Sequence, residues 1–180
     1  SISYPMVILS TVLFSTIGGF LGLIVFRMDF IILMTMLGII SLIGVVVNNA
    51  IVLMDFAKLL FERQREKLGL PEDAPLPNDA TREALIIAGK TRLRPVLLTA
   101  VTAVLGLLPL AIGFNLNFGT LFSELNPHMH IGGDNVIFWG PLSWAVIYGL
   151  TFATFLTLIM VPVMLLIIAK VKHRRAWKEQ

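Results

Sequence analysis

Four apolar stretches divide this sequence, and each is long enough to cross a lipid bilayer. A hydrocarbon core of about 30 Å requires about 20 apolar residues, because each helical residue rises about 1.5 Å. Polar and turn-forming segments separate the stretches, which cover residues 6–26, 30–54, 95–114 and 141–169. We therefore predict an all-α fold, a polytopic transmembrane helical bundle with four membrane-spanning helices.

The connections between the spans differ in length and character. Only residues 27–29 separate the first two spans, so these helices should be antiparallel neighbours. In the second connection, residues 55–94, we expect the second helix to run on to about Lys67. Asn78 or Asp79 should then cap an amphipathic helix that lies along the membrane surface, with Ala84, Leu85 and Ala88 on its apolar face. The third connection, residues 115–140, is rich in glycine and is expected to be a loop.

The basic residues are placed very unevenly. Of the 14 Lys and Arg residues, only Arg27 lies on the side of the first and third connections. The others lie in the second connection or after the last span, and the positive-inside rule assigns that side to the cytoplasm. We therefore expect a multi-pass membrane protein with both ends of this segment and residues 55–94 cytoplasmic, and with residues 115–140 on the opposite side of the membrane.

Composition narrows the function classes. Hydrophobic residues make up 57% of the 180 residues, charged residues 14%, and the mean hydropathy is +0.87, which is typical of membrane proteins and not of soluble domains. There is no cysteine, and no Ser-His-Asp order or glycine-rich phosphate loop stands in a suitable context. We predict that the chain is not an enzyme, needs no cofactor and binds no nucleic acid, since orientation explains the basic loop. Contact with membrane lipid, including anionic lipid, is expected.

A cluster of potential metal ligands lies in the third connection. It comprises Glu124, His128, His130 and Asp134, within eleven residues of one another. The spacing matches no strong metal-binding signature, so we predict no metal site and interpret the segment as a solvated or docking loop.

Small residues and prolines inside the spans are interpreted as structural. Gly18 and Gly22 form a small-xxx-small pair, with Ser15 near one turn before it, which is typical of close helix packing in lipid. Gly38, Gly44 and Gly106 are assigned the same role, and Pro109 and Pro162 are expected to kink their helices without breaking them.

The second span carries a stripe of polar residues. Ser41, Asn48 and Asp55 recur every seven residues and therefore lie near one line of the helix, with Asn49 beside it. A single Asn in a membrane helix can serve only as interhelical glue. Two adjacent amides need several partners, however, and such partners are often ionisable groups on another helix.

The third span carries a similar stripe, formed by Arg92, Thr99 and Gly106, with Thr102 nearby. Measured from the span centres, Asn48 and Thr99 each lie about 9 Å toward the cytoplasm, and Asp55 and Arg92 each lie about 20 Å that way. We hypothesise that Asp55 and Arg92 approach one another, while the Asn pair and Thr99 line a polar site within the membrane. For Arg92, an ordinary interfacial anchor is the alternative.

Three sequence blocks resemble those of resistance-nodulation-division (RND) efflux transporters. The first runs from Gly44 to Phe56 as GVVVNNAIVLMDF, the second from Arg92 to Thr99 as RLRPVLLT, and the third from Gly106 to Leu110 as GLLPL. The resemblance covers nearly the whole chain, which would correspond to the last four of twelve transmembrane helices of a longer transporter.

The resemblance implies a homotrimer of the bacterial inner membrane, with residues 115–140 in the periplasm. It also implies coupling of proton influx to the export of drugs or other amphiphilic compounds, the basis of multidrug resistance. Its expected partners are the first eight helices and periplasmic domains of the same chain, a periplasmic adaptor and an outer-membrane channel. It assigns proton-relay positions to Asn48, Asn49, Arg92 and Thr99, with Asn48 in place of a family lysine. A non-transporting sensor or anchor module, and a protein-export accessory of the same superfamily, are the alternatives.

Overall fold

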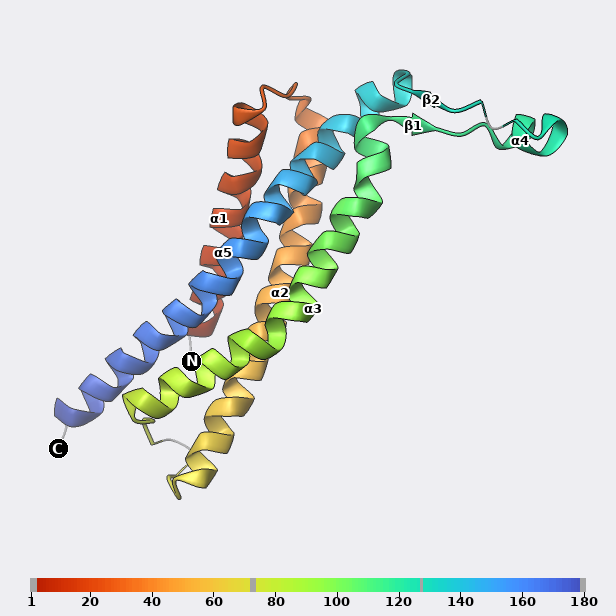
Figure 1. Ribbon diagram of the computed structural model, residues 1–180. Helices are drawn as coiled ribbons and strands as arrows, with labels where there is room; N and C mark the ends of the chain where they lie inside the picture. The colour runs from red at the N-terminus through yellow and green to blue at the C-terminus, as the bar shows by residue number, and fades with distance from the viewer. Residues whose placement is uncertain (1–2, 72–73, 127, 179–180) are drawn as a thin grey trace.

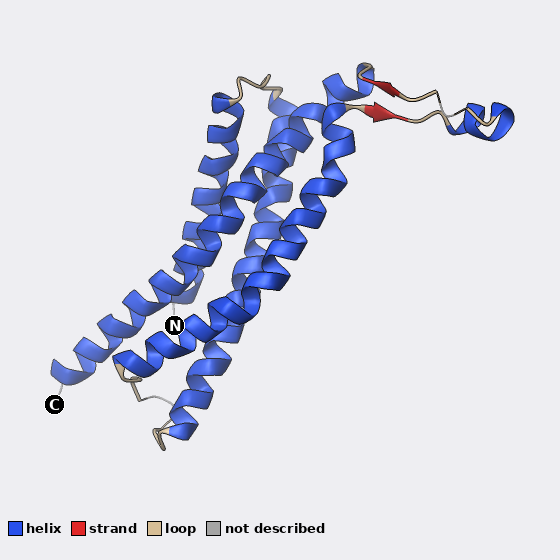
Figure 2. Ribbon diagram, viewed as in Figure 1, coloured by secondary structure: helices blue, strands red, loops and turns tan. Residues whose placement is uncertain are grey.

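Four long helices form the body of the protein. The computed structural model describes residues 3–71, 74–126 and 128–178, with side chains through residue 172. Each long helix has the length and apolar composition needed to cross a membrane, so the predicted all-α transmembrane bundle is confirmed (Figures 1 and 2). The elements are α1 (Ser3–Val25), α2 (Ile32–Lys67), α3 (Asn78–Ile112), β1 (Phe114–Asn115), α4 (Phe118–Glu124), β2 (His130–Ile131) and α5 (Asp134–Lys178).

Helix α5 is the centre of the bundle, since it packs against α1, α2 and α3 (Figure 1). Its contact with α1 depends on small residues. A side chain at Gly18 would collide with Phe152, and one at Gly22 would collide with Tyr148, while Ser15 is fully buried. The sequence prediction that these three α1 residues form a close-packing seam is therefore confirmed.

The predicted cytoplasmic helix is present, but it is continuous with the third span. Helix α3 begins at Asn78 and passes through Pro95 without interruption, and Figure 1 shows that it changes direction between its lime and green parts. Proline removes one backbone hydrogen bond, which permits a bend while the remaining bonds hold the helix. Pro109 in α3 and Pro162 in α5 likewise lie inside unbroken helices, as expected.

The apolar face of the first part of α3 packs against other helices. Ala84, Leu85 and Ala88 are buried in a cluster with Ala57 of α2 and Leu165 of α5, among others. This face is therefore covered by protein, because the neighbouring ends of α2 and α5 extend far enough to reach it. The expected placement of the helix along the membrane surface stays a prediction. Helix α2 ends at Lys67, as expected.

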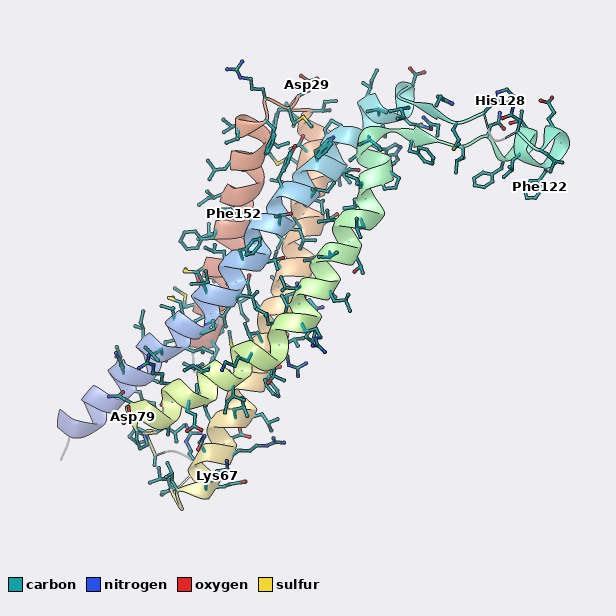
Figure 3. The ribbon with its side chains drawn as sticks, viewed as in Figure 1. Asp29, Lys67, Asp79, Phe122, His128 and Phe152 are labelled. Carbon is teal, nitrogen blue, oxygen red and sulfur yellow. The ribbon has the colours of Figure 1, made fainter. Side chains whose placement is uncertain are left out.

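The two ends of the bundle carry different connections. Figure 3 shows Asp29, in the short α1–α2 turn, at one end, and Lys67 and Asp79 at the other. The connection after α3 was expected to be only a loop, but it forms a short hairpin in which β1 pairs with β2 and α4 lies at the tip. This hairpin extends sideways from the bundle (Figure 2), and Phe122 in α4 is 84% exposed.

An aromatic group joins α1, α3 and α5 at the end of the bundle that carries Asp29. The rings of Phe26 and Tyr148 stack with centroids 4.7 Å apart, and Tyr148 stacks on Trp144 at 5.3 Å. The indole Nε1 of Trp144 donates to the carbonyl oxygen of Ala111 at 3.1 Å. That carbonyl belongs to the last turn of α3, where helical partners are lacking.

We expect Trp144→Phe to lower the thermal unfolding midpoint of the full-length protein. The phenyl ring keeps the stacking but leaves the Ala111 carbonyl without its donor, a loss of about 1 kcal/mol. A fluorescence-detected thermal melt in detergent measures the effect. Trp139→Phe is the matched control, because Trp139 is 40% exposed and its indole donates to no acceptor among the described residues. Equal shifts in both variants would contradict the role of the hydrogen bond.

Candidate functional site

The polar residues of α2 lie on the side of the helix that faces away from α5. Leu42 and Val46 are buried in a cluster with Leu150 of α5. Asn48 follows Val46 by two residues, a rotation of about 200° around the helix, and its side chain is exposed. Ser41 is exposed as well, whereas Asn49 is half-buried on the flank.

The polar residues of the membrane-spanning part of α3 also lie on the side of their helix that faces away from α5. Ala100 belongs to the buried cluster that contains Leu42, and Thr102 follows it by two residues, again a rotation of about 200°. Because α2 and α3 pack against each other and α5 packs against both, Asn48 and Thr102 lie on the side of the α2–α3 pair opposite α5. Thr99 is also exposed. We call this surface the outer α2–α3 face; its residues are Ser41, Gly44, Asn48, Thr99, Thr102 and Gly106.

The hydrogen-bonding capacity of this face is only partly used. The Thr99 hydroxyl donates to carbonyl oxygens of its own helix, Pro95 at 2.8 Å or Val96 at 2.9 Å. The Thr102 hydroxyl bonds in the same way within α3. Among the described residues, the side-chain amides of Asn48 and Asn49 make no hydrogen bond. The face therefore offers amide donors and acceptors, together with hydroxyl lone pairs, to groups beyond this chain.

At two positions of the outer α2–α3 face, glycine leaves the helix backbone uncovered by a side chain. A methyl group added at Gly44 or Gly106 would meet nothing within 4 Å, in contrast to the glycines that pack against α5. The predicted packing role of Gly44 and Gly106 is therefore not fulfilled within this chain. Small residues in a membrane helix permit close approach of another helix, and these two leave the backbone open to one.

Arg92 lies beside this face and is held by α2. Its guanidinium carbon is 4.5 Å from the centroid of the Phe56 ring, a cation–π contact between α3 and α2. The Nε atom is buried, and no described residue accepts its hydrogen. Sequence reasoning missed Phe56, because a contact between two helices depends on their register in space and leaves no spacing signal.

The expected contact between Asp55 and Arg92 is not formed. The Asp55 carboxylate is 65% exposed, and its ion pair among the described residues is with Lys58 at 3.4 Å, one turn along α2. The Lys58 ammonium in turn lies 4.4 Å from the centroid of the Tyr4 ring of α1. Asp55 therefore points toward α1, whereas Arg92 reaches Phe56, about 100° further around α2. The prediction considered only how deep Asp55 and Arg92 lie along their helices, and it did not consider the direction in which each side chain points.

The histidines of the hairpin form no metal cluster among the described residues. The Nε2 atom of His128 lies 3.7 Å from a carboxylate oxygen of Glu124, and both side chains are well exposed. His130 contacts the backbone oxygen of His128 at 3.4 Å through Nδ1. His128 lies near the tip of the hairpin, far from the bundle (Figure 3).

The polar side chains on the outer α2–α3 face would be unfavourable if they were exposed to lipid. An amide without a hydrogen-bond partner in hydrocarbon costs several kcal/mol, on the order of 2–7. Such residues in membrane helices therefore face protein or water-filled cavities. The arrangement fits an interface with further membrane helices that supply acidic or other polar partners.

Comparison with known proteins identifies the kind of protein that contains such helices. The sequence model of the AcrB/AcrD/AcrF family matches residues 1–119. The chain is 38% identical over 176 residues to the swarming motility protein SwrC of Bacillus subtilis, covering 98% of this chain. It is 33% and 32% identical to the multidrug resistance protein MdtC of Erwinia tasmaniensis and of Erwinia amylovora, covering 97% of this chain in each case. The chain spans about 14% of the length of each of these relatives. Together with its four apolar helices, this similarity shows that the chain belongs to the AcrB/AcrD/AcrF family of RND transporters.

Proposed function

We propose that this chain is the C-terminal membrane part of a proton-driven RND exporter of drugs or other amphiphilic compounds, and that it supplies partner residues for the proton relay. The observation that carries the proposal is the outer α2–α3 face. Its polar residues point away from the core of the bundle. The chain spans about 14% of the length of its relatives, whose remaining helices could supply partners for this face. The family membership favours a transporter over a sensor or anchor module.

The chemistry of the face suits a carboxylate that gains and loses a proton. An ionised carboxylate only accepts hydrogen bonds, and a protonated one also donates; an Asn amide provides both a donor and an acceptor, so it can pair with either form. The Arg92 guanidinium, seated on Phe56, is a fixed positive charge at the cytoplasmic side of the face. A nearby cation stabilises the ionised carboxylate.

Asn48 gives this relay a particular character. The family resemblance places a lysine at this position, and a lysine changes salt-bridge partners when a carboxylate is protonated. An amide carries no charge, so in this protein the protonation change is transmitted by exchanged hydrogen bonds. Thr99 and Asn49 are the nearby groups that take part in the exchange, with Ser41 and Thr102 supporting them. Asp55 is a weaker candidate, because it points toward α1.

The orientation and assembly belong to the same proposal. The chain is a multi-pass membrane protein. Its family membership suggests the bacterial inner membrane, and the charge asymmetry supports a cytoplasmic position for the basic connection between α2 and α3. The remaining helices and periplasmic domains of the transporter, a homotrimeric assembly, a periplasmic adaptor and an outer-membrane channel are the partners that the family membership suggests.

We expect Arg92→Gln to reduce proton-coupled transport in the full-length transporter. The variant loses the fixed cation and the contact with Phe56, and proton flux should fall by about tenfold, equivalent to about 1.4 kcal/mol. The measurement uses proteoliposomes with an imposed pH gradient, an internal pH indicator and a fluorescent amphiphilic dye as the exported compound.

Arg94→Gln is the matched control. It removes the same charge two residues further along α3, where the side chain is exposed, and should leave flux within about twofold of the original protein. If both variants keep full proton flux, Arg92 is an interfacial anchor. If dye export continues at full rate without a pH gradient, the transporter is not proton-driven.

A further inference from the structure

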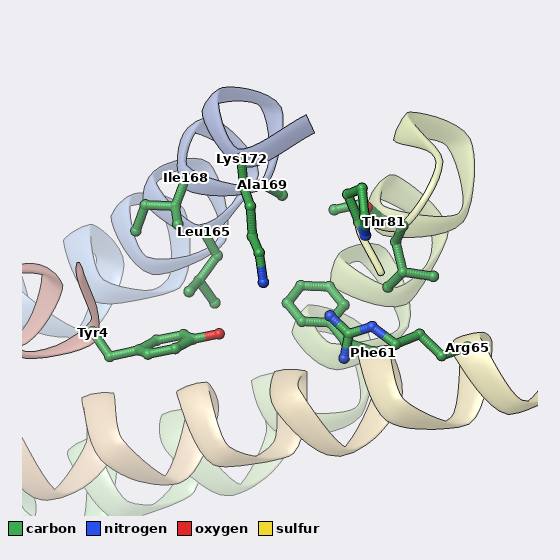
Figure 4. A pocket seen from close by; sticks show the side chains of 10 residues that line it. Tyr4, Phe61, Arg65, Thr81, Leu165, Ile168, Ala169 and Lys172 are labelled. Carbon is green, nitrogen blue, oxygen red and sulfur yellow. The ribbon is translucent and has the colours of Figure 1, made fainter. Parts of the chain in front are cut away.

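A pocket with a mixed polar and apolar lining lies at the end of the bundle that carries the basic connection (Figure 4). It contains about 480 Å³ of space, including the part that opens to solvent. All four long helices contribute to it, together with the segment that leads into α3. Its lining includes Tyr4, Phe61, Arg65, Thr81, Leu165 and Lys172.

Two cations and a hydroxyl point into this space. Figure 4 shows the Lys172 amine, the Arg65 guanidinium and the Tyr4 hydroxyl directed toward its centre from three different helices. Arg65 is held in place because its Nε donates to the carbonyl oxygen of Ala74 at 3.1 Å, which leaves its terminal nitrogens for a ligand. Two positive charges that share a pocket repel each other, and an anion between them turns that repulsion into attraction.

A third cation contacts the Tyr4 ring. The Lys58 ammonium lies 4.4 Å from the ring centroid, and the same ammonium pairs with Asp55. The pocket wall formed by α3 is fixed as well, because the Thr81 hydroxyl bonds to the Pro77 carbonyl oxygen at 3.0 Å. Arg65 and Tyr4 are thus held by the fold before any ligand arrives, which lowers the entropic cost of binding.

The remaining lining is apolar and continues toward the membrane. Phe61, Leu76 and Leu165 are each more than 90% buried, and Ile168 is half-buried beside them. The pocket also lies where the apolar residues of α5 give way to Lys170 and Lys172, which marks the edge of the bilayer. A free inorganic anion would gain nothing from an apolar contact, whereas a lipid would bury part of an acyl chain against the half-buried Ile168.

We propose that this pocket binds an anionic phospholipid, with the phosphate group between Arg65 and Lys172 and within reach of the Tyr4 hydroxyl. The upper part of an acyl chain lies against the half-buried Ile168. Basic pockets between membrane helices suit such headgroups. The residues of this site are different from those of the outer α2–α3 face, so lipid binding can be tested without assuming the proposed proton relay.

The test is native mass spectrometry of the full-length transporter titrated with dioleoyl phosphatidylglycerol. Lys172→Gln should weaken the apparent affinity about tenfold, since it removes one charge-assisted hydrogen bond. Lys170→Gln is the matched control; it removes an equal charge two residues earlier on α5, does not line the pocket, and should change the affinity by less than about twofold. The proton flux of the Lys172 variant is measured as well, so that an effect on the proposed proton relay is distinguished from an effect on lipid binding.

Two further titrations identify the source of the phosphate. Dioleoyl phosphatidylcholine, which is zwitterionic, should bind more weakly than phosphatidylglycerol in the original protein and should respond little to Lys172→Gln. Inorganic phosphate at millimolar concentration should not displace phosphatidylglycerol. Equal losses in the Lys172 and Lys170 variants would mean diffuse attraction to the basic surface, and displacement by inorganic phosphate would mean a free-anion site. Either result overturns the proposal.

Discussion

Asn48→Ala should abolish drug export by the full-length transporter while leaving its membrane insertion intact. The side chain lies on the outer α2–α3 face and contributes nothing to the buried cluster around Leu42 and Val46, so its truncation does not disturb the bundle. What it removes is an amide that we propose to pair with a relay carboxylate. Removing one partner of a buried carboxylate costs more than a neutral hydrogen bond, about 1.5–3 kcal/mol, which corresponds to a loss of about 10- to 150-fold.

The measurement is the minimal inhibitory concentration of an exported drug in a strain that lacks its own pumps, with membrane-protein levels compared by immunoblot. Ile40→Ala is the control on the same helix, because Ile40 is 65% exposed and carries no polar group. It should leave resistance nearly unchanged. Full resistance in the Asn48 variant would remove Asn48 from the relay, and a loss of equal size in both variants would point to helix packing.

Gly38→Ala should destabilise the helix bundle, because the added methyl group would meet the backbone of α5. An added Cβ would lie 2.8 Å from the Leu142 carbonyl oxygen and 3.2 Å from the Ala145 Cβ. Backbone of α5 cannot rotate out of the way as a side chain does, so the two helices must separate. Overpacking of this kind costs about 1–3 kcal/mol. The thermal midpoint of the purified protein should fall by several degrees.

Gly89→Ala is the control for this substitution. Gly89 lies in the first part of α3, and a methyl group added there meets nothing within 4 Å. Alanine favours a helix over glycine by about 1 kcal/mol, so this variant should be as stable as the original protein or more stable. Equal thermal midpoints for the Gly38 and Gly89 variants would show that the contact between α2 and α5 can accommodate an added methyl group.

The membrane spans were predictable because hydrocarbon imposes a length and an apolar composition on any helix that crosses it. The Ser15–Gly18–Gly22 seam was predictable for a similar reason, since only small residues let helices approach closely in lipid. The continuity of α3 was not. Pro95 and the charged residues before it mark a boundary in the sequence, but a kinked helix satisfies the same pattern as two helices. The hairpin of β1, β2 and α4 is too short for a periodic signal.

The candidate site was predictable in its helical positions and not in its contacts. Seven-residue spacing placed Asn48 and Ser41 on one side of α2, and they are found together there. Asp55 follows the same spacing, yet Lys58 and the adjacent α1 hold it elsewhere. Periodicity fixes the direction of a side chain on its own helix, whereas the partner depends on how neighbouring helices are placed. The roles of these residues in a relay stay predictions.

The unbroken course of α3 links two distant places. Although α3 changes direction along its course, its backbone is continuous, and the same helix carries Thr99 on the outer α2–α3 face and Thr81 in the wall of the pocket that Lys172 also lines. A movement of α3 that protonation causes near Thr99 would therefore change the shape of the phospholipid pocket near Thr81. By thermodynamic reciprocity, the kind of lipid seated there would alter the ease of proton uptake.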